Sequence, residues 1–490
     1  MKKLNLLESS TLFGAYANHA PVVLARLRRA RVLWINYGAI SDDNIYFGKK
    51  DDYKAYEEHI IRSCAYEVVS GYLKYSSFGD TEIGYADRYG GAGIGHNGGS
   101  GRAVVVNGYH VKGVGQTPLV STLPEEIFST GEAYLEECIR EVIFSEIVAH
   151  DFPHSSVPVL AIIDTGLNAE ICVKGERKFR RRTLLVRPCF LRPAHFERAG
   201  GFVSCDPKSG AIDQRRVEKF FSNAILVLGR EELEKAYSSL WGNWARQLAH
   251  SFVARLLHGS NTISNISLDG RLVDFGAMSS VPSWSNISIG LQVQPFVRNF
   301  NVISDAVRSL SYYFWRYFDK NFGEQKAIEY TINNAQIEYN RAIAFEVLRI
   351  FGIEHDLAFS ATSNDRYKSI FNLAVKLINH FQKTYIDLAS SPHFDSAGWD
   401  IELVWSDNTP IHLKEFRSVL NGLMTNSGLD TAASRCLAAS SSRPNLSKEI
   451  LRLKIYSSFE ENFARSGTID VELIYSFIGT SVAESRRNFY

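Results

Sequence analysis

The residues His258-Gly-Ser-Asn-Thr-Ile-Ser-Asn265, followed by Val273-Asp274-Phe275-Gly276, carry the strongest signal in this 490-residue sequence. They offer an amide oxygen at Asn265 and a carboxylate at Asp274. Mg²⁺ prefers hard oxygen ligands of this kind. Asp-Phe-Gly alone could be a turn after a strand. Its position after a His-Gly loop, at the end of the helix predicted over 231–257, favours a metal site.

A lysine and a glutamate upstream fit the same kind of site. The spacing from His258 to Asn265 equals that of the protein-kinase pattern H-R-D-x-x-x-x-N, and Asp274 begins a D-F-G. In that pattern a strand lysine holds phosphates and a carboxylate on the next helix fixes the lysine. Lys112 follows a hairpin predicted at Asn107-Gly108, and Glu141 lies in a helix predicted over 132–149. Taken singly, each could equally be an exposed charge.

The segment 89–102, YGGAGIGHNGGSGR, contains a G-x-G-x-x-G at Gly93, Gly95 and Gly98. A strand, 103–106, follows it, whereas a dinucleotide fold requires a helix there. The order favours a loop that covers phosphates between two antiparallel strands. A flexible glycine-rich loop is the simpler alternative. Arg187 and Arg192 could fork onto phosphate oxygens, or they could be surface arginines.

In this order the residues resemble the selenoprotein O family of protein-kinase-like adenylyltransferases. The likeness covers segments 89–103, 111–118, 139–141, 187–197 and 258–276. The family patterns there are Y-x-G-H-x-x-G-x-x-x-G-x-x-G-D-G-R-A, L-K-G-x-G-x-T-P, I-R-E, R-x-x-x-x-x-x-R-F-G-H-F-E, and H-G-V-M-N-T-D-N with D-Y-G. No single motif is specific, but the ordered set is.

The resemblance implies ATP with Mg²⁺ or Mn²⁺, and transfer of AMP rather than the γ-phosphate to a protein hydroxyl. It implies four catalytic residues: Lys112, Glu141, Asn265 and Asp274. Of these, Asn265 and Asp274 would hold the metal. The residues implied to bind the nucleotide are Gly93, Gly95, Gly98, Gly99, Gly101, Arg102, Lys112, Arg187, Arg192 and Asn261.

The sequence departs from the family at consequential positions. Ser264 stands where the family has the Asp proposed as general base, and Ser260 stands where a kinase has its catalytic Asp. A neutral serine cannot accept a proton from an attacking hydroxyl at pH 7. Arg187 and Arg192 lie closer together than the family's pair, and the family's first loop Asn falls on Thr262, beside Asn261.

Three functions therefore stay open. The first is adenylyl transfer to a hydroxyl of a protein or peptide, which makes the chain a nucleotidyltransferase. The second is adenylation of a carboxylate, a peptide C-terminus or a small acid, which needs no base. Proteins similar to this family accompany the maturation of siderophore-carrying microcins, and an acyltransferase partner would fit that role. The third is a non-catalytic pseudoenzyme that binds a nucleotide and supports a partner.

The expected fold class is α+β, a kinase-like bilobal fold with a small β-rich N-lobe and a large, mainly helical C-lobe. We expect an N-terminal extension over 1–80, the N-lobe over 81–186, a nucleotide- and metal-binding core over 187–300, and a helical region over 301–490. The apolar spacing predicts helices around 307–318, 335–351, 370–381, 450–463 and 471–478.

Composition sets the remaining expectations. Lys and Arg number 54 and Asp and Glu 53, so a generally basic nucleic-acid-binding protein is excluded. A basic stretch at 174–182 is expected to be a solvated hairpin tip, with an anion-binding patch as the alternative. The six cysteines are scattered and the N-terminus resembles no signal peptide. We expect a cytoplasmic protein with neither a nucleic-acid nor a membrane partner.

Overall fold

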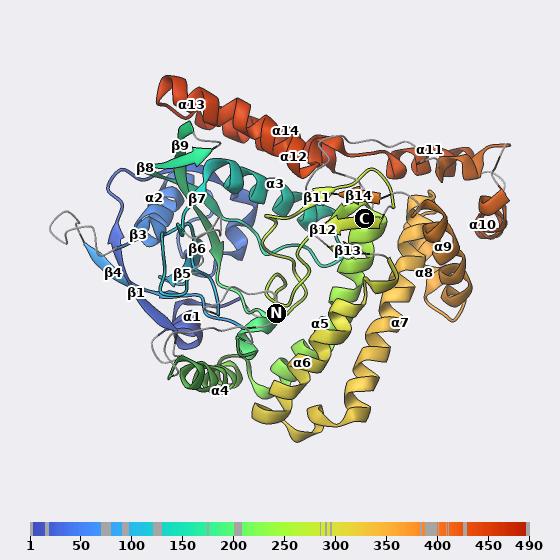
Figure 1. Ribbon diagram of the computed structural model, residues 1–490, viewed down its shortest axis with the longest axis horizontal. Helices are drawn as coiled ribbons and strands as arrows, with labels where there is room; N and C mark the ends of the chain where they lie inside the picture. The colour runs from blue at the N-terminus through green and yellow to red at the C-terminus, as the bar shows by residue number, and fades with distance from the viewer. Residues whose placement is uncertain are drawn as a thin grey trace.

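The hairpin at Asn107-Gly108 lies in the middle of the sheet in the computed structural model of this chain (Figure 1). Asn107 and Gly108 have φ angles of 49° and 81°, as a tight type I′ turn requires. The flanking strands β5 (Ala103–Val106) and β6 (Tyr109–Lys112) pair antiparallel, with Ala103 opposite Lys112. Both strands are buried along their whole length, so Lys112 is anchored in the core of the sheet.

The structure describes residues 3–14, 19–69, 80–90, 98–120, 130–173, 176–199, 208–284, 286–289, 292–294, 296–382, 385–387, 399, 401–407, 409, 411–424 and 429–486. Gly93, Gly95, Lys174 and Cys205 lie outside these ranges. Of the cysteines whose side chains the structure describes, Cys64, Cys138, Cys189 and Cys436 are free thiols.

The main sheet is antiparallel, in the order β2-β8-β9-β6-β5-β4-β1-β3, and β7 also pairs with β9. Its other strands are β1 (Ala20–Arg26), β2 (Arg31–Ile35), β3 (Tyr66–Val68), β4 (Thr81–Ala86), β7 (Ala133–Tyr134), β8 (Ala161–Val173) and β9 (Glu176–Pro188). Because β1, β2 and β3 belong to this sheet, the expected extension over 1–80 is structurally part of the β-rich region. Small strand pairs also form among β10 (Leu256–Leu257), β11 (Ser279–Ser280), β12 (Asn286–Ile289), β13 (Gln292–Gln294) and β14 (Tyr385–Asp387).

Helices dominate the second half of the chain, as the spacing predicted. The helices are α1 (Leu6–Phe13), α2 (Tyr53–Cys64), α3 (Leu135–Asp151), α4 (Lys208–Leu228), α5 (Arg230–Val253), α6 (Asn301–Tyr317), α7 (Gln325–Ile350), α8 (His355–Thr362), α9 (Tyr367–Phe381), α10 (Ile411–Leu423), α11 (Leu429–Ser440), α12 (Lys448–Ile455), α13 (Glu461–Ser466) and α14 (Val471–Ser485). Across the described part of the chain, none of the helices combines the length and apolar character needed to cross a bilayer.

Two helix predictions need correction. The helix predicted over 231–257 ends at Val253, because Arg255 takes a left-handed φ of 56° and Leu256–Leu257 then pairs with β11. The helix predicted over 450–463 is interrupted by a π-helical turn, Tyr456–Glu460, between α12 and α13. Apolar spacing alone reveals neither break.

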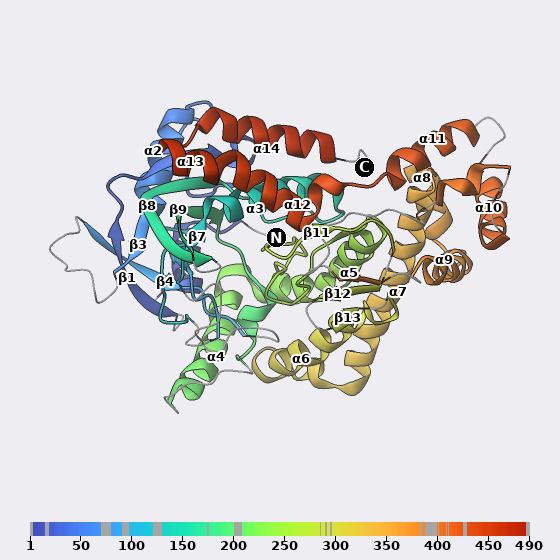
Figure 2. The ribbon, with the colours of Figure 1, turned by 45° about the horizontal axis from the view of Figure 1, so that its top comes forward.

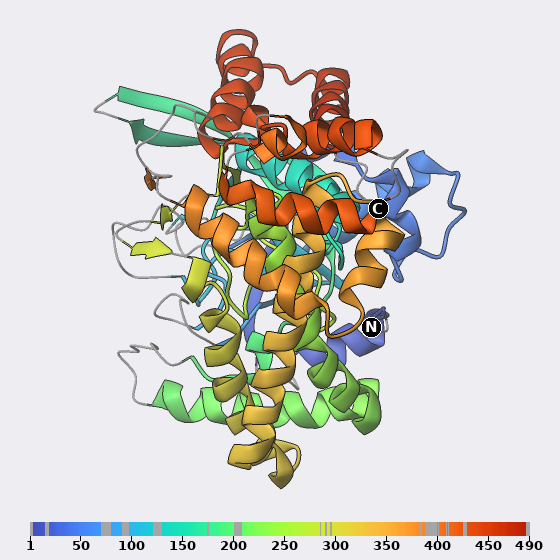
Figure 3. The same ribbon diagram turned by 90° about the vertical axis from the view of Figure 1, so that its right-hand side faces the viewer.

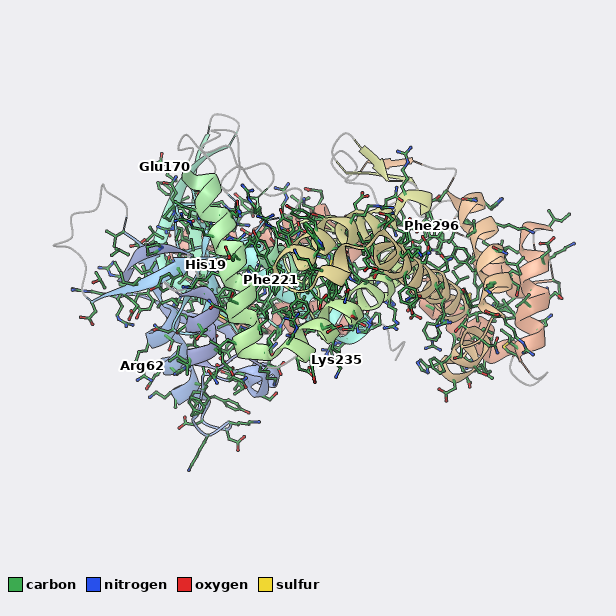
Figure 4. All side chains as sticks on the ribbon, turned by 90° about the horizontal axis from the view of Figure 1, so that it is seen from below. His19, Arg62, Glu170, Phe221, Lys235 and Phe296 are labelled. Carbon is green, nitrogen blue, oxygen red and sulfur yellow. The ribbon has the colours of Figure 1, made fainter. Side chains whose placement is uncertain are left out.

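Helix α3 lies at the centre of the molecule and is buried on most of its surface. It packs against β9 on one side and against α12 and α14 on the other (Figure 2). Seen from below, Phe221 of α4 lies between the sheet and the helices (Figure 4). Its ring packs on Phe196 and Phe314, with centroids 4.8 and 5.0 Å away. The sheet and the helical region therefore share one continuous core.

The described part of the basic stretch, 176–182, belongs to strand β9 of the β8–β9 hairpin, which projects beside the C-terminal helices (Figure 3). Arg180 pairs with Glu136 at 3.3 Å, Arg181 with Asp164 at 2.6 Å, and Arg182 with Glu132 at 3.1 Å. These three arginines were expected to be solvated or to form an anion-binding patch. Instead, they lie in ion pairs at the base of the hairpin.

Candidate functional site

Lys112 is the hub of the site that the sequence predicted. Its Nζ lies 2.9 Å from Glu141 Oε1, 3.2 Å from Asp274 Oδ1 and 3.1 Å from Glu137 Oε1. Strand β6, helix α3 and the Asp-Phe-Gly segment thus meet at one ammonium group. The expected convergence of Lys112, Glu141 and Asp274 is present in the structure.

The charges at this hub hold each other ionised. Burial would lower the pKa of Lys112, and so would Arg102, but the three carboxylates raise it above its ordinary value. Partial burial would raise the pKa of Asp274, but Lys112 and then Arg102 lower it well below its usual range. The site therefore presents the Lys112 ammonium group and the Asp274 carboxylate, which both stay charged at neutral pH.

Glu141 ties three segments together. Its carboxylate is 1% exposed, and Oε2 accepts hydrogen bonds from Arg187 Nη2 at 2.7 Å and from the Phe275 main-chain N–H at 3.2 Å. Oε1 meets Lys112. One buried carboxylate thus fixes β6, β9 and the segment after Asp274. Glu141 is therefore not the exposed helical charge that was the alternative interpretation.

The two predicted metal ligands lie on paired segments. Val273 N–H donates to the Asn265 carbonyl at 3.0 Å, and Ile266 and Leu272 form an antiparallel bridge. His258 Nε2 lies 3.0 Å from the Val273 carbonyl. Asn265 and Asp274 therefore stand at the same end of a short two-stranded loop.

The donor atoms of these two residues fit a hard divalent cation. Asn265 Nδ2 donates to the carbonyl and hydroxyl of Ser260 at 3.0 and 2.9 Å, and no described residue donates to its Oδ1. The Asp274 side chain is 43% exposed and so remains open to a ligand. Among the described residues there is no group of three or more His, Cys, Asp and Glu that could hold a metal. Mg²⁺ needs only one or two protein ligands when phosphates complete its shell.

Asp274 has a strained main chain. Its φ is 63°, in the left-handed region that residues other than glycine rarely adopt. Such strain persists where surrounding contacts impose it, and it is concentrated at functional sites. Lys112 on the side chain and the Glu141 bond to Phe275 N–H supply such contacts here.

Ser264 and Ser260 are both engaged in hydrogen bonds. Ser264 is buried, and its hydroxyl lies 2.7 Å from that of Thr262. The Ser260 hydroxyl accepts from Asn265. The loop 258–265 contains no carboxylate. A carboxylate base for a hydroxyl acceptor is therefore not supplied by this loop.

The two arginines expected at the phosphates are both buried. Arg187 bonds to Glu141, and its Nε has no hydrogen-bond partner within the described ranges. Arg187 thus keeps donor capacity for an anion. Arg192 is more fully engaged: Nη1 donates to the Ser264 carbonyl, and Nε lies 3.4 Å from Asp87 Oδ2. The structure gives Arg192 a protein partner where the resemblance implied a phosphate.

The described end of the glycine-rich segment packs closely on its surroundings. A Cβ on Gly99, whose φ is 132°, would lie 2.5 Å from the Asp87 carbonyl oxygen, and one on Gly101 would lie 2.7 Å from Val120 Cα. Gly98 also has a positive φ, 67°. Arg102 binds both oxygens of Glu137, at 3.0 and 2.8 Å. Asn261 lies partly exposed on the loop that carries Asn265.

Sequence reasoning missed several residues of this site. Glu137 lies one helical turn before Glu141, and that spacing could have identified it. Asp87 accepts from His195 Nε2 at 2.9 Å and lies 3.1 Å from His110 Nε2. Its partners come from distant segments, so no local pattern points to it. Arg140, beside Glu141, donates to the Gly276 carbonyl at 2.6 Å.

Two cavities of about 510 and 470 Å³ lie along α5 and α7, and both are lined by Arg246 and Glu338. None of the predicted site residues lines either of them. The site is thus defined by converging charged groups, and these cavities are separate features.

Neither a scan against protein-family models nor a search of curated proteins found a match for this chain. The resemblance described above therefore depends on the motifs in the sequence alone.

Proposed function

We propose that this chain is an ATP- and Mg²⁺-dependent nucleotidyltransferase with a kinase-like bilobal fold, and that it transfers AMP to a protein or peptide acceptor. The observation that carries the proposal is the contact of Lys112 Nζ with both Glu141 and Asp274, residues from three separate segments. An ammonium group fixed by a helix carboxylate beside a metal-ligand carboxylate is the arrangement that phosphoryl-transfer sites use.

The residues have distinct roles in this proposal. Asn265 Oδ1 and Asp274 would hold Mg²⁺, which supplies neutralisation of phosphate charge when bound. Lys112 and Arg187 contribute positive charge from the β-sheet side. The acceptor oxygen forms a bond to the α-phosphorus, the bond from that phosphorus to the α,β-bridging oxygen breaks, and pyrophosphate leaves. For a hydroxyl acceptor, its proton leaves to solvent.

Adenylation of a carboxylate is the alternative that a specific observation favours. Ser264 carries no charge and is bonded to Thr262, so a hydroxyl acceptor finds no carboxylate base on this loop. A carboxylate is already ionised at neutral pH. Attack by a peptide C-terminus or small acid gives an acyl-adenylate, which an acyltransferase partner could then consume.

The test uses ATP labelled at the α-phosphate. Transfer to a hydroxyl predicts acid-stable label on protein or added peptide, and Asp274→Ala should abolish it. Asp269→Ala is the matched control, because Asp269 lies on the same loop and pairs with Arg271. This control should retain labelling. Ser264→Asp should raise hydroxyl labelling by about tenfold or more, since a positioned base contributes at least that much.

The same preparation separates the alternatives. ATP–pyrophosphate exchange that requires an added carboxylic acid or peptide would support carboxylate adenylation. Tight ATP binding with neither labelling nor exchange would identify a pseudoenzyme. Failure to bind ATP in the presence of Mg²⁺ or Mn²⁺ would refute the proposal.

A further inference from the structure

Two buried arginines each bond a main-chain carbonyl beside a predicted metal ligand. Arg192 Nη1 donates to the carbonyl of Ser264, the residue before Asn265. Arg140 Nη1 donates to the carbonyl of Gly276, two residues after Asp274, at 2.6 Å. Both guanidinium groups are less than one-tenth exposed. One arginine thus reaches each of the two paired segments, from opposite parts of the fold.

Arg192 is itself held rigidly. Its guanidinium lies over the rings of Tyr89 and Phe190, at 4.9 and 4.5 Å from their centroids. Asp87 lies 3.4 Å from its Nε and also accepts from His195, whose Nδ1 accepts from the Arg192 main-chain N–H at 2.9 Å. A stacked, ion-paired arginine loses little further entropy when it bonds Ser264, so the contact can fix the loop.

Arg140 is held by a separate set of charges. Its Nε lies 3.2 Å from Glu136 Oε1, and Glu136 Oε2 lies 3.3 Å from Arg180 of the β9 strand. Helix α3 thus presents Glu137 and Glu141 to Lys112 and, from the adjacent position, Arg140 to Gly276. The helix that organises the ion-pair cluster also fixes the far end of the Asp-Phe-Gly segment.

A cation site needs this kind of support. Divalent cations require ligand oxygens at a fixed separation, and Asn265 and Asp274 lie on irregular segments, one of them with a strained φ. Residues that orient the ligands of a metal site typically change its affinity tenfold to hundredfold when mutated.

We infer that Arg140 and Arg192 are positioning residues, which hold the Asp274 and Asn265 segments at the separation that a divalent cation requires. Their action is through Gly276 and Ser264, and they contact no metal themselves. The inference rests on the proposed function in one respect, namely that Asn265 and Asp274 are the metal ligands.

The experiment measures binding, independently of turnover. Mn²⁺ is titrated into the full chain with α,β-methylene-ATP, which cannot be cleaved at the α-phosphate, and free Mn²⁺ is followed by electron paramagnetic resonance. We expect Arg140→Met and Arg192→Met to weaken Mn²⁺ binding by about tenfold to hundredfold. Affinity for the analogue without metal should stay within about twofold. Arg140→Lys and Arg192→Lys should recover part of the loss, because lysine keeps the charge and one donor.

Arg443→Met is the matched control. Arg443 is also buried and also donates to a main-chain carbonyl, that of Ala254 at 3.0 Å, but it contacts no residue next to Asn265 or Asp274. Arg443→Met should lower the melting temperature and leave Mn²⁺ affinity unchanged. If a methionine variant does not fold, the corresponding lysine variant decides the question by the same titration.

Three outcomes would overturn the inference. The first is Mn²⁺ affinity in the folded Arg140 and Arg192 variants that equals that of the unmodified chain or of Arg443→Met. The second is a loss of analogue affinity without metal in Arg192→Met, which would assign Arg192 to the phosphates. The third, no Mn²⁺–analogue binding by the unmodified chain, would overturn the proposed function as well, whereas the first two leave it standing.

Discussion

Glu137 shows how strongly the site depends on ion pairing at single residues. Burial alone would raise its pKa, but Arg102 and then Lys112 lower the pKa of Glu137 to about 2. Its side chain is 10% exposed, so solvent screens these contacts little. The ionised carboxylate is therefore favoured in the folded state relative to the unfolded chain.

This shift predicts a pH dependence of stability. Because the folded-state pKa lies below the unfolded value of 4.5, the stabilisation is complete above that value and is lost as the pH falls towards 2. Between pH 6 and pH 3 Glu137 should contribute a loss of about 2 kcal/mol in the free energy of unfolding. Urea unfolding should show this part of the pH dependence missing in Glu137→Gln.

Glu415→Gln, which alters an exposed ion pair with Lys376, should keep the full pH dependence of stability. Equal pH dependence in all three proteins would contradict the assignment.

Among single residues, the sequence predicted those site residues that belong to a short motif. Lys112, Glu141, Asn265 and Asp274 were identified from short motifs. The structure brings Lys112, Glu141 and Asp274 into one ion-pair hub, and Asn265 lies on the segment that pairs with Val273, next to Asp274. Asp87 was not identified, because its partners His110 and His195 come from β6 and from the segment before α4. Charge–charge contacts between distant segments leave no periodic signal in a sequence.

Among the elements, the strands and helices around the site were predicted better than their ends. The hairpin predicted at Asn107-Gly108 is present in the structure, and so are α3 and the long helices that apolar spacing predicted. Helix α5 was predicted to extend too far, because Leu256 continues the apolar spacing of the helix. The positive φ angle of Arg255 nevertheless ends the helix before Leu256. The strands β8 and β9 run for 13 residues each.

Gly113 directly follows strand β6, and its substitution tests how closely this strand end packs against β9. Its φ is 99°, and a Cβ there would lie 2.6 Å from the Thr183 carbonyl oxygen and 2.7 Å from Ala133 Cβ. Gly229, before α5, has a similar φ of 89° but open space around it. Alanine at either position should incur backbone strain of about 1 kcal/mol. Only Gly113→Ala adds a clash with main chain in β9.

We therefore expect Gly113→Ala to lower the free energy of unfolding by about 2 kcal/mol more than Gly229→Ala, as measured by urea unfolding. Because Gly113 follows Lys112, the displaced strand should also weaken ATP binding by calorimetry, whereas Gly229→Ala should leave it unchanged. Equal destabilisation by the two substitutions would show that the strand accommodates the added methyl group.

For the whole molecule, the sequence predicted a β-rich part followed by a helical part, but not how the ends of the chain join them. β1 pairs with β3 and β4, so part of the first 80 residues completes the sheet. The last helices return to pack on α3 and β2, and the Ile35 main-chain N–H donates to the Tyr475 hydroxyl at 2.8 Å. These contacts join residues hundreds of positions apart, which local spacing cannot predict.

Arg443 makes several contacts of this long-range kind. Its guanidinium bonds Asp151 at the end of α3 at 2.9 Å and the Ala254 carbonyl after α5 at 3.0 Å, while its own carbonyl accepts from the Ser280 hydroxyl at 2.6 Å. The side chains of Asp151 and Arg443 are 1% and 6% exposed. Loss of one partner would leave the other as a buried charge without its counter-ion.

Removing either partner should therefore cost more than the pair itself contributes. We expect Asp151→Asn and Arg443→Met each to lower the free energy of unfolding by about 3–5 kcal/mol. The double variant should lose at least about 1 kcal/mol less than the sum of the two, because no unpaired charge remains. Urea unfolding of the four proteins gives this coupling energy directly. Additive losses, within about 0.5 kcal/mol, would contradict the prediction, because they would show no coupling between Asp151 and Arg443.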